Sequence, residues 1–194
     1  MHDKAVDVRP GEELNLEQLS SYLQQQVTGF THINSVKQFP GGFSNLTYLL
    51  DTNMGEWVLR RPPRGAKIKS AHDMGREFKL QQALKPVYGY VPNMEAFCDD
   101  ENILGTDFYV MEKLTGIIPR KNLPRGLTPT PERTKKLCEN VLDCLVELHK
   151  VDYKQANLSH LGKGEGYTQR QISGWSERFT KAKTWNVPSG KKVI

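Results

Sequence analysis

The amino-acid sequence predicts an α+β fold, in which an antiparallel sheet comes first and a mostly helical region follows. The first observation is a set of three β-like runs at residues 32–38, 46–51 and 56–60, which short loops join as in an antiparallel meander. The second is the strongest helical pattern of the chain, which begins at residue 130. Residues 115–129, which are punctuated by proline and glycine, separate the two regions.

Composition limits the class of protein. The chain has 194 residues, of which 37% are hydrophobic and 25% are charged, as is typical of a globular protein in water. No stretch approaches the roughly 20 apolar residues that a membrane-spanning helix needs, and residues 1–7 lack the apolar core of a secretory signal. The three cysteines have no CxxC spacing, which argues against a disulfide framework or a zinc site. We therefore expect a cytoplasmic protein without membrane contact.

The net charge of +5 is concentrated in two basic clusters. The first consists of Arg60, Arg61, Arg64, Lys67 and Lys69, and the second of Lys181, Lys183, Lys191 and Lys192. Such clusters can bind polyphosphates or nucleic acid, but most are solvated surfaces, and no recognised nucleic-acid-binding motif accompanies them. We therefore do not expect nucleic acid as a partner.

Residues 1–114 are expected to form the first lobe. Residues 15–27 predict a helix, because its apolar residues recur on one stripe and Gly29 follows as a stop signal. Pro62 and Pro63 end the third strand, since neither can donate to a ladder. A second helix is predicted over 70–84, and two further strands over 94–98 and 108–113.

The second predicted helix carries two signals. Ser70 and Asp73 have the spacing of a capping box and place its start at Ser70. Met74, Phe78 and Gln81 share one face, with Glu77 on its border and able to face the sheet.

Residues 115–129 are predicted to connect this lobe to an incomplete helical lobe at 130–194. Thr130 and Pro131 suit an N-cap and first turn. The helix that follows is amphipathic, and its stripe is expected to point into a second core; it consists of Leu137, Val141, Leu145 and Leu148. A last helix is predicted over 167–183.

The turn at residues 39–45 has two interpretations. Gly41 and Gly42 lie between two predicted strands and allow close approach of the backbone to a ligand, because neither has a Cβ atom. Successive N–H groups of such a turn can bind an anion such as phosphate. Two adjacent glycines are also a common hairpin signal, so the turn alone does not distinguish a phosphate loop from a simple hairpin.

Arg60 and Glu77 favour the phosphate loop. The chain has a glycine turn between strands, then a basic residue at the end of the third strand, and then an acid on the next helix. The small lobe of a kinase has these parts in this order, with the basic residue gripping phosphates and the acid orienting it. Each residue alone has a simpler explanation as a surface charge. Their joint order predicts a protein-kinase-like lobe.

Several longer runs resemble the aminoglycoside phosphotransferase and choline kinase superfamily. They are residues 41–48 (GGFSNLTY), 57–63 (WVLRRPP), 71–78 (AHDMGREF) and 108–112 (FYVME), with further matches at Leu148-His149 and 166–175. Within the superfamily they are most similar to the branch that contains the kinase-like N-terminal domains of acyl-CoA dehydrogenase 10 and 11. The resemblance extends over roughly residues 12–185.

This resemblance implies a nucleotide-binding site. The loop of Gly41, Gly42, Phe43, Ser44 and Asn45 would cover the phosphates of ATP or GTP, with Mg²⁺ as the metal. Arg60 stands where many kinases have lysine, and Glu77 would orient it. Met111 would line the adenine pocket, and the backbone of Glu112, Lys113 and Leu114 would bond to the base. Guanidinium is a broader, forked donor than an ammonium group, so the grip of Arg60 on phosphate would differ in geometry.

The groups that transfer phosphate are expected outside this chain. His149, Asp152, Lys154 and Asn157 imitate a catalytic loop, but the spacing is His-x-x-Asp and not His-x-Asp, and no aspartate follows Asp152 to hold a metal. The resemblance implies that His149 and Asp152 end a core helix.

We therefore expect the N-terminal part of a small-molecule phosphotransferase that acts on a hydroxyl group and is inactive as given. The alternative is a non-catalytic nucleotide-binding or protein-interaction module. The acceptor stays open between an aminoglycoside, a hydroxylated acyl-CoA and other alcohols.

Overall fold

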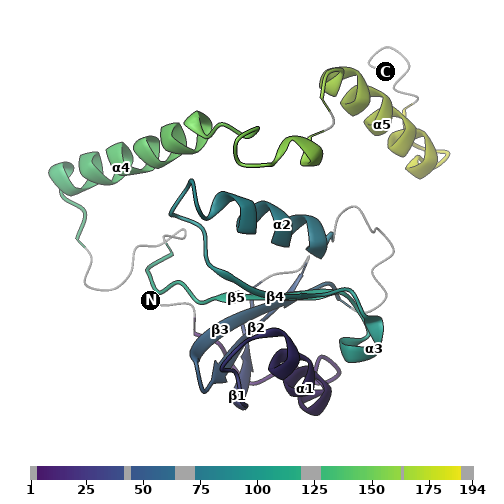
Figure 1. Cartoon of the computed structure of the whole chain (residues 1–194). Coiled ribbons are helices and arrows are strands. Elements are labelled where there is room, and N and C mark those ends of the chain that lie inside the picture. The colour runs from purple at the N-terminus through teal and green to yellow at the C-terminus, as the bar shows by residue number, and fades with distance from the viewer. Residues whose placement is uncertain (1–3, 42–44, 64–72, 119–127, 163, 189–194) are drawn as a thin grey trace. The chain divides into compact units, whose positions relative to one another are not determined.

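A computed structural model describes residues 4–41, 45–63, 73–118, 128–162 and 164–188. Every predicted strand and helix is present, with ends that differ by a few residues (Figure 1). The elements are α1 (Leu16–Gln26), β1 (Ile33–Gln38), β2 (Leu46–Thr52), β3 (Gly55–Arg61), α2 (Met74–Leu84), β4 (Met94–Cys98), α3 (Glu101–Leu104), β5 (Phe108–Glu112), α4 (Pro131–Lys150), a 3-10 turn at Ser159–Leu161, and α5 (Tyr167–Ala182).

The five strands form one antiparallel sheet with the order β1-β2-β3-β5-β4. The meander predicted for β1, β2 and β3 is confirmed, and β5 rather than β4 lies beside β3. Opposite residues in adjacent strands share a face. Thr47, Arg60 and Tyr109 therefore form one row on one face, because Thr47 pairs with Arg60 and Arg60 with Tyr109.

One face of the sheet is sealed by α1 (Figure 1). Buried and partly exposed residues alternate strictly along β2, where every second residue from Leu46 to Thr52 is buried. The buried set packs against Leu19 and Leu23 of α1 and against Phe30, which stacks on Trp57 with ring centroids 5.6 Å apart. This face is the hydrophobic core of the described chain.

The opposite face is covered by α2 (Figure 1). Phe78 of α2 packs on Phe97 and on Tyr109, with ring centroids 5.5 and 6.5 Å apart. At Gly75 a Cβ atom would lie 3.1 Å from the ring of Phe97, so the helix lies close to β4 at this point. The helix begins at Met74, with Asp73 as the N-cap that accepts from the Arg76 N–H, so the predicted start at Ser70 is wrong. Ser70 itself lies outside the described residues.

Arg61 points into the core and is only 1% exposed. Its guanidinium donates to the Leu104 carbonyl at 3.1 Å, the Glu12 carbonyl at 3.1 Å and the Tyr48 hydroxyl at 3.0 Å. Its Cζ lies 5.4 Å from the centroid of the Tyr48 ring. The predicted surface cluster of basic residues therefore loses Arg61, because the pleat turns consecutive residues to opposite faces. Arg64, Lys67 and Lys69 lie outside the described residues.

An extended segment before α1 fastens to the end of β1. The backbones of Val6 and Gln38 exchange two hydrogen bonds, of 2.8 and 2.7 Å. The buried Gln38 side chain also accepts from the Arg9 N–H at 3.0 Å and donates to Glu12 at 2.5 Å. Residues 6–12, here called the arm, thus brace the strand that leads into the glycine turn.

The chain divides into two compact units, residues 1–157 and 158–194. The predicted connector at 115–129 lies inside the first unit, and the lobe boundaries stay a prediction. None of the helices in the described residues is long and apolar enough to cross a lipid bilayer.

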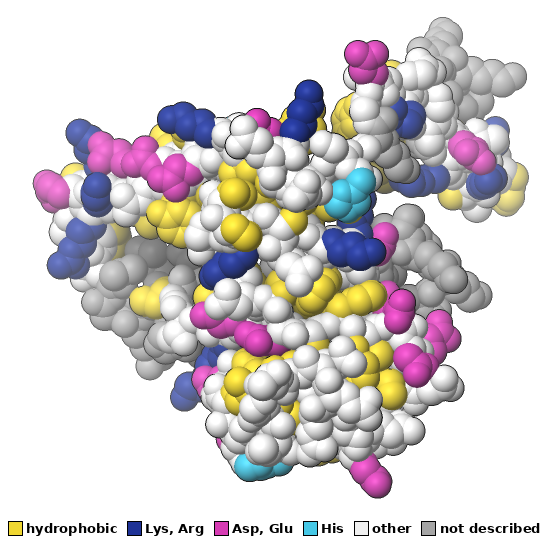
Figure 2. Space-filling view, in the orientation of Figure 1, with side chains coloured by type: hydrophobic (Ala, Val, Ile, Leu, Met, Phe, Trp, Pro, Cys, Tyr) yellow, Lys and Arg dark blue, Asp and Glu magenta, His cyan; other side chains and the backbone are white. Residues whose placement is uncertain are grey.

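The apolar stripe of α4 is exposed and forms no second core within the described residues. Leu137, Val141 and Leu145 are 51, 60 and 47% exposed, and hydrophobic side chains are visible along this helix in Figure 2. The amphipathic helix was predicted correctly, but the expected core beneath it was wrong for the part of the chain that the structure describes. Ile172 and Trp175 of α5 are exposed in the same way.

Candidate nucleotide-binding site

The predicted pair Arg60 and Glu77 meets on the α2 face of the sheet. An Nη1 atom of Arg60 lies 3.3 Å from Oε2 of Glu77, and the two side chains are 32 and 35% exposed. The pairing arises because Arg60 is the last residue of β3 that points to this face, and Glu77 lies in the first turn of the helix that covers the face. An ion pair at this exposure contributes only about 0.2–1 kcal/mol, so by itself it fixes geometry weakly.

Tyr109 lies beneath this ion pair. Its hydroxyl donates to the same Oε2 atom of Glu77 at 2.9 Å, and its side chain is fully buried. A hydrogen bond to a charged group contributes about 1.5–3 kcal/mol, which exceeds the value of the ion pair above it. Burial raises the pKa of Tyr109 to about 12, so the hydroxyl stays protonated at neutral pH and can donate.

The strand that follows the glycine turn lies beside Arg60. β2 begins immediately after Asn45, and its second residue, Thr47, pairs with Arg60. Gly41 is exposed and Asn45 is buried, so the two ends of the turn are held differently. Gly42, Phe43 and Ser44 lie outside the described residues, and their predicted contact with phosphates stays a prediction.

Met111 lies in an apolar patch next to Arg60. It pairs with Val58, which in turn pairs with Leu49, so the three side chains share the face of Arg60. Val58 is buried, and Leu49 and Met111 are partly exposed. An apolar surface beside a cationic side chain suits a flat base joined to phosphates.

Two of the backbone N–H groups after Met111 already donate hydrogen bonds within the protein. The Glu112 N–H donates to the Asn93 carbonyl at 2.9 Å, and the Lys113 N–H to the Glu56 carbonyl at 3.4 Å. Their side chains bind Asn93 and Glu56 in turn. Within the described residues Leu114 is therefore the member of the predicted base-binding segment whose N–H group has no partner, and it is 55% exposed.

Asp152 has a structural role in the described chain. Its Oδ1 accepts from the N–H groups of Lys154 and Gln155 at 2.9 and 3.2 Å, which closes a turn directly after α4. This agrees with the expectation that the segment ends a helix. No group of three or more potential metal ligands occurs among the residues that the structure describes.

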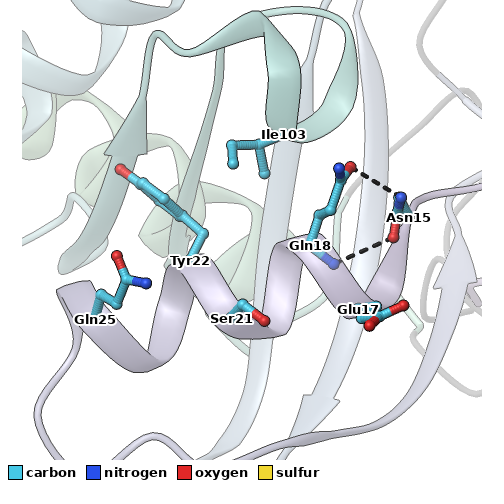
Figure 3. Close-up of a pocket in the computed structure, with 7 residues that line it drawn as sticks. All are labelled: Asn15, Glu17, Gln18, Ser21, Tyr22, Gln25 and Ile103. Carbon is cyan, nitrogen blue, oxygen red and sulfur yellow. Dashed lines mark hydrogen bonds between the residues drawn. The ribbon is translucent and has the colours of Figure 1, made fainter.

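A hollow of about 380 Å³ lies elsewhere and is lined by residues of α1 and by Ile103 of α3. Figure 3 shows Gln18 and Gln25 projecting from the helix, Tyr22 beside them, and Ile103 facing them from α3. Tyr22 is already engaged, because its hydroxyl donates to the Phe97 carbonyl at 2.5 Å. α1 covers the sealed face, so this hollow lies on the other side of the sheet from Arg60 and Glu77.

Sequence reasoning missed Tyr109 and Val58. Both lie in strands that were predicted, but each reads as an ordinary buried strand residue. The signal that identifies them is the register, because Arg60 pairs with Tyr109, and Met111 with Val58. That register requires β5 to lie beside β3, and this neighbour could not be predicted from the order of the strands along the chain.

The sheet, α2 and the residues on its face together define a kinase-like phosphotransferase fold. A solved structure of a candidate aminoglycoside phosphotransferase from Ralstonia eutropha JMP134 has this fold, with a TM-score of 0.71 and 31% sequence identity. The match covers 91% of this chain and 50% of that one.

The chain belongs to the phosphotransferase enzyme family, whose model matches residues 35–186. It is 34% identical over 188 residues to acyl-CoA dehydrogenase family member 11 of Rattus norvegicus, covering 95% of this chain and 24% of that protein. It is also 34% identical over 157 residues to family member 10 of Mus musculus, covering 81% of this chain and 14% of that protein. The chain therefore spans about a quarter or less of the length of these relatives.

Proposed function

We propose that this chain is the nucleotide-binding part of an ATP-dependent phosphotransferase that phosphorylates a hydroxyl group of a small molecule. The observation that carries the proposal is the Arg60–Glu77 ion pair, 3.3 Å long, in which Arg60 pairs with Thr47 of the strand that follows the glycine turn. Membership of the phosphotransferase family supports the reaction type.

Each part of the site has a role in this proposal. The turn at 41–45 covers the phosphates, and Arg60 donates to them while Glu77 holds its guanidinium in place. Leu49, Val58 and Met111 contact the base, and Leu114 bonds to its edge. The chain would thereby hold the nucleotide and neutralise part of its charge, which are the main contributions of a protein to phosphoryl transfer.

Transfer also needs groups that we place outside this chain. They are an aspartate that accepts the hydroxyl proton and the ligands of Mg²⁺, which neutralises charge on the phosphates. The acceptor is then chosen outside this chain as well. The names of the similar proteins mention an aminoglycoside and an acyl-CoA. We therefore propose to test an aminoglycoside and an acyl-CoA that carries a hydroxyl group, because the transfer needs a hydroxyl acceptor.

The test uses the full-length gene product. We expect ATP with Mg²⁺ to raise its melting temperature, and [γ-³²P]ATP to label an alcohol in a panel that includes both acceptor classes. Arg60→Met should weaken ATP binding at least tenfold, which corresponds to the loss of one charged hydrogen bond. Arg76→Met is the matched control, because Arg76 is exposed on the same helix as Glu77. Absence of any ATP-dependent shift would refute the proposal.

A second candidate is nucleotide binding without transfer. It is favoured by the use of Asp152 in a local turn, where the carboxylate accepts from the N–H groups of Lys154 and Gln155. Under this candidate the full-length gene product binds ATP and labels no alcohol. Label in any acceptor excludes it.

A further inference from the structure

We propose that Tyr109 is a positioning residue of the nucleotide site, which acts through Glu77 to hold Arg60. This inference rests on the proposed function. It concerns a residue that does not itself touch the nucleotide, since its side chain is fully buried beneath the ion pair.

The contacts place Tyr109 at the centre of the pair. Its hydroxyl and the Nη1 atom of Arg60 approach the same oxygen, Oε2 of Glu77, at 2.9 and 3.3 Å. Arg60 is also the direct neighbour of Tyr109 in the sheet, and its Cζ lies 6.0 Å from the centroid of the Tyr109 ring. One phenol thus contacts both members of the pair.

The surroundings make Tyr109 a fixed point. Phe78 packs on its ring and also on Phe97, which pairs with Tyr109 in the sheet. The hydroxyl donates to Glu77, and Gln81, one turn further along α2, donates its Nε2 to the Glu77 carbonyl at 3.5 Å. A rotation of α2 about its axis would disturb the bond from Tyr109 to Glu77 and the ring contact with Phe78, so both contacts oppose such a rotation.

This arrangement solves a problem that the ion pair leaves. Arg60 and Glu77 are each about one-third exposed, and two such side chains can separate and become hydrated. A buried donor on Oε2 of Glu77 restricts the position of that carboxylate, and thereby the position of Arg60. The grip on phosphate is then formed before the nucleotide arrives.

The test is a double-mutant cycle on the full-length gene product, with ATP and Mg²⁺ as the titrant. Tyr109→Phe keeps the ring and removes only the hydroxyl. We expect it to weaken ATP binding about fivefold to tenfold, and Glu77→Gln to weaken it by at least as much. The double variant should bind no more weakly than Glu77→Gln, because Tyr109 acts through that carboxylate. Tyr22→Phe is the control, since it removes another bonded hydroxyl on the opposite face of the sheet and should leave affinity within twofold.

The outcomes separate the two proposals. Multiplicative losses in the double variant, or unchanged affinity in Tyr109→Phe, overturn the positioning role. If the wild-type protein binds no ATP, the proposed function fails, and the positioning contact is then judged by urea unfolding of the same four variants. Non-additive stability changes for Tyr109→Phe and Glu77→Gln support the contact, and additive changes refute it.

Discussion

Two consecutive arginines of β3 provide a matched pair of substitutions, Arg60→Met and Arg61→Met. Each replaces a guanidinium by an unbranched apolar side chain, one position apart. Arg61→Met removes a buried group that donates to the Leu104 carbonyl, the Glu12 carbonyl and the Tyr48 hydroxyl. Arg60→Met removes one partner of an ion pair that is about one-third exposed, on the other face.

The structure sets the size of each effect. Without Arg61, the Glu12 carbonyl keeps the Tyr48 hydroxyl as a donor at 2.7 Å, but the buried Leu104 carbonyl loses the donor that Arg61 supplies. One such acceptor costs about 1–3 kcal/mol, and the lost bonds from a charged donor add to it. Relief from burying the charge opposes these losses. We expect Arg61→Met to lower the free energy of unfolding by about 2–4 kcal/mol, and Arg60→Met by about 0.2–1 kcal/mol.

Urea unfolding followed by circular dichroism measures both values, and ATP titration gives the second readout. Arg61→Met should lose stability and keep the affinity of the molecules that remain folded, whereas Arg60→Met should do the reverse. A loss below about 1 kcal/mol in Arg61→Met would mean that desolvation of its charge cancels the hydrogen bonds. A larger loss in Arg60→Met than in Arg61→Met would contradict the assignment of the two residues to opposite faces.

Two further predictions concern α2 and the two tyrosines Tyr22 and Tyr109. Asp73→Ala removes the N-cap acceptor of the Arg76 N–H and should destabilise the chain by about 1 kcal/mol, whereas Asp73→Asn keeps an acceptor and should cost less; thermal melts compare them, and equal losses contradict the cap. Burial raises the pKa of Tyr22 and of Tyr109 to about 12, while tyrosines of the unfolded chain titrate near 10. Between these values the unfolded chain binds fewer protons, so the free energy of unfolding should fall as pH rises from 10 to 12. Urea unfolding across that range should show a smaller fall in the free energy of unfolding for Tyr109→Phe than for wild type. An identical fall in both proteins would show that Tyr109 does not cause it.

Arg60 and Glu77 could be predicted from the sequence because their order along the chain, after a glycine turn and on successive elements, carries the information. Arg61 could not be assigned in the same way. In the sequence it is one of several neighbouring basic residues, and only the register of β3 against β2 shows that it faces inward opposite Leu46. A shift of one residue would exchange the two arginines.

Tyr109 illustrates a different limit. An aromatic residue in a strand predicts burial, and that expectation is correct, but the partner of its hydroxyl depends on a contact with a residue 32 positions away. The stripe of α4 shows the converse. Periodicity predicted the helix and its apolar side, whereas what covers that side is not a local property of the helix.

The arm at residues 6–12 has a consequence for how this protein is handled. It contacts Gln38 and Arg61, which the ribosome adds 26 and 49 positions after Glu12, so its contacts are complete only after three strands have been synthesised. A bulky fusion or a truncation at this end therefore disturbs the end of β1, which leads into the glycine turn. The ATP affinity measured on such a protein then depends on the contacts of the arm as well as on the glycine turn.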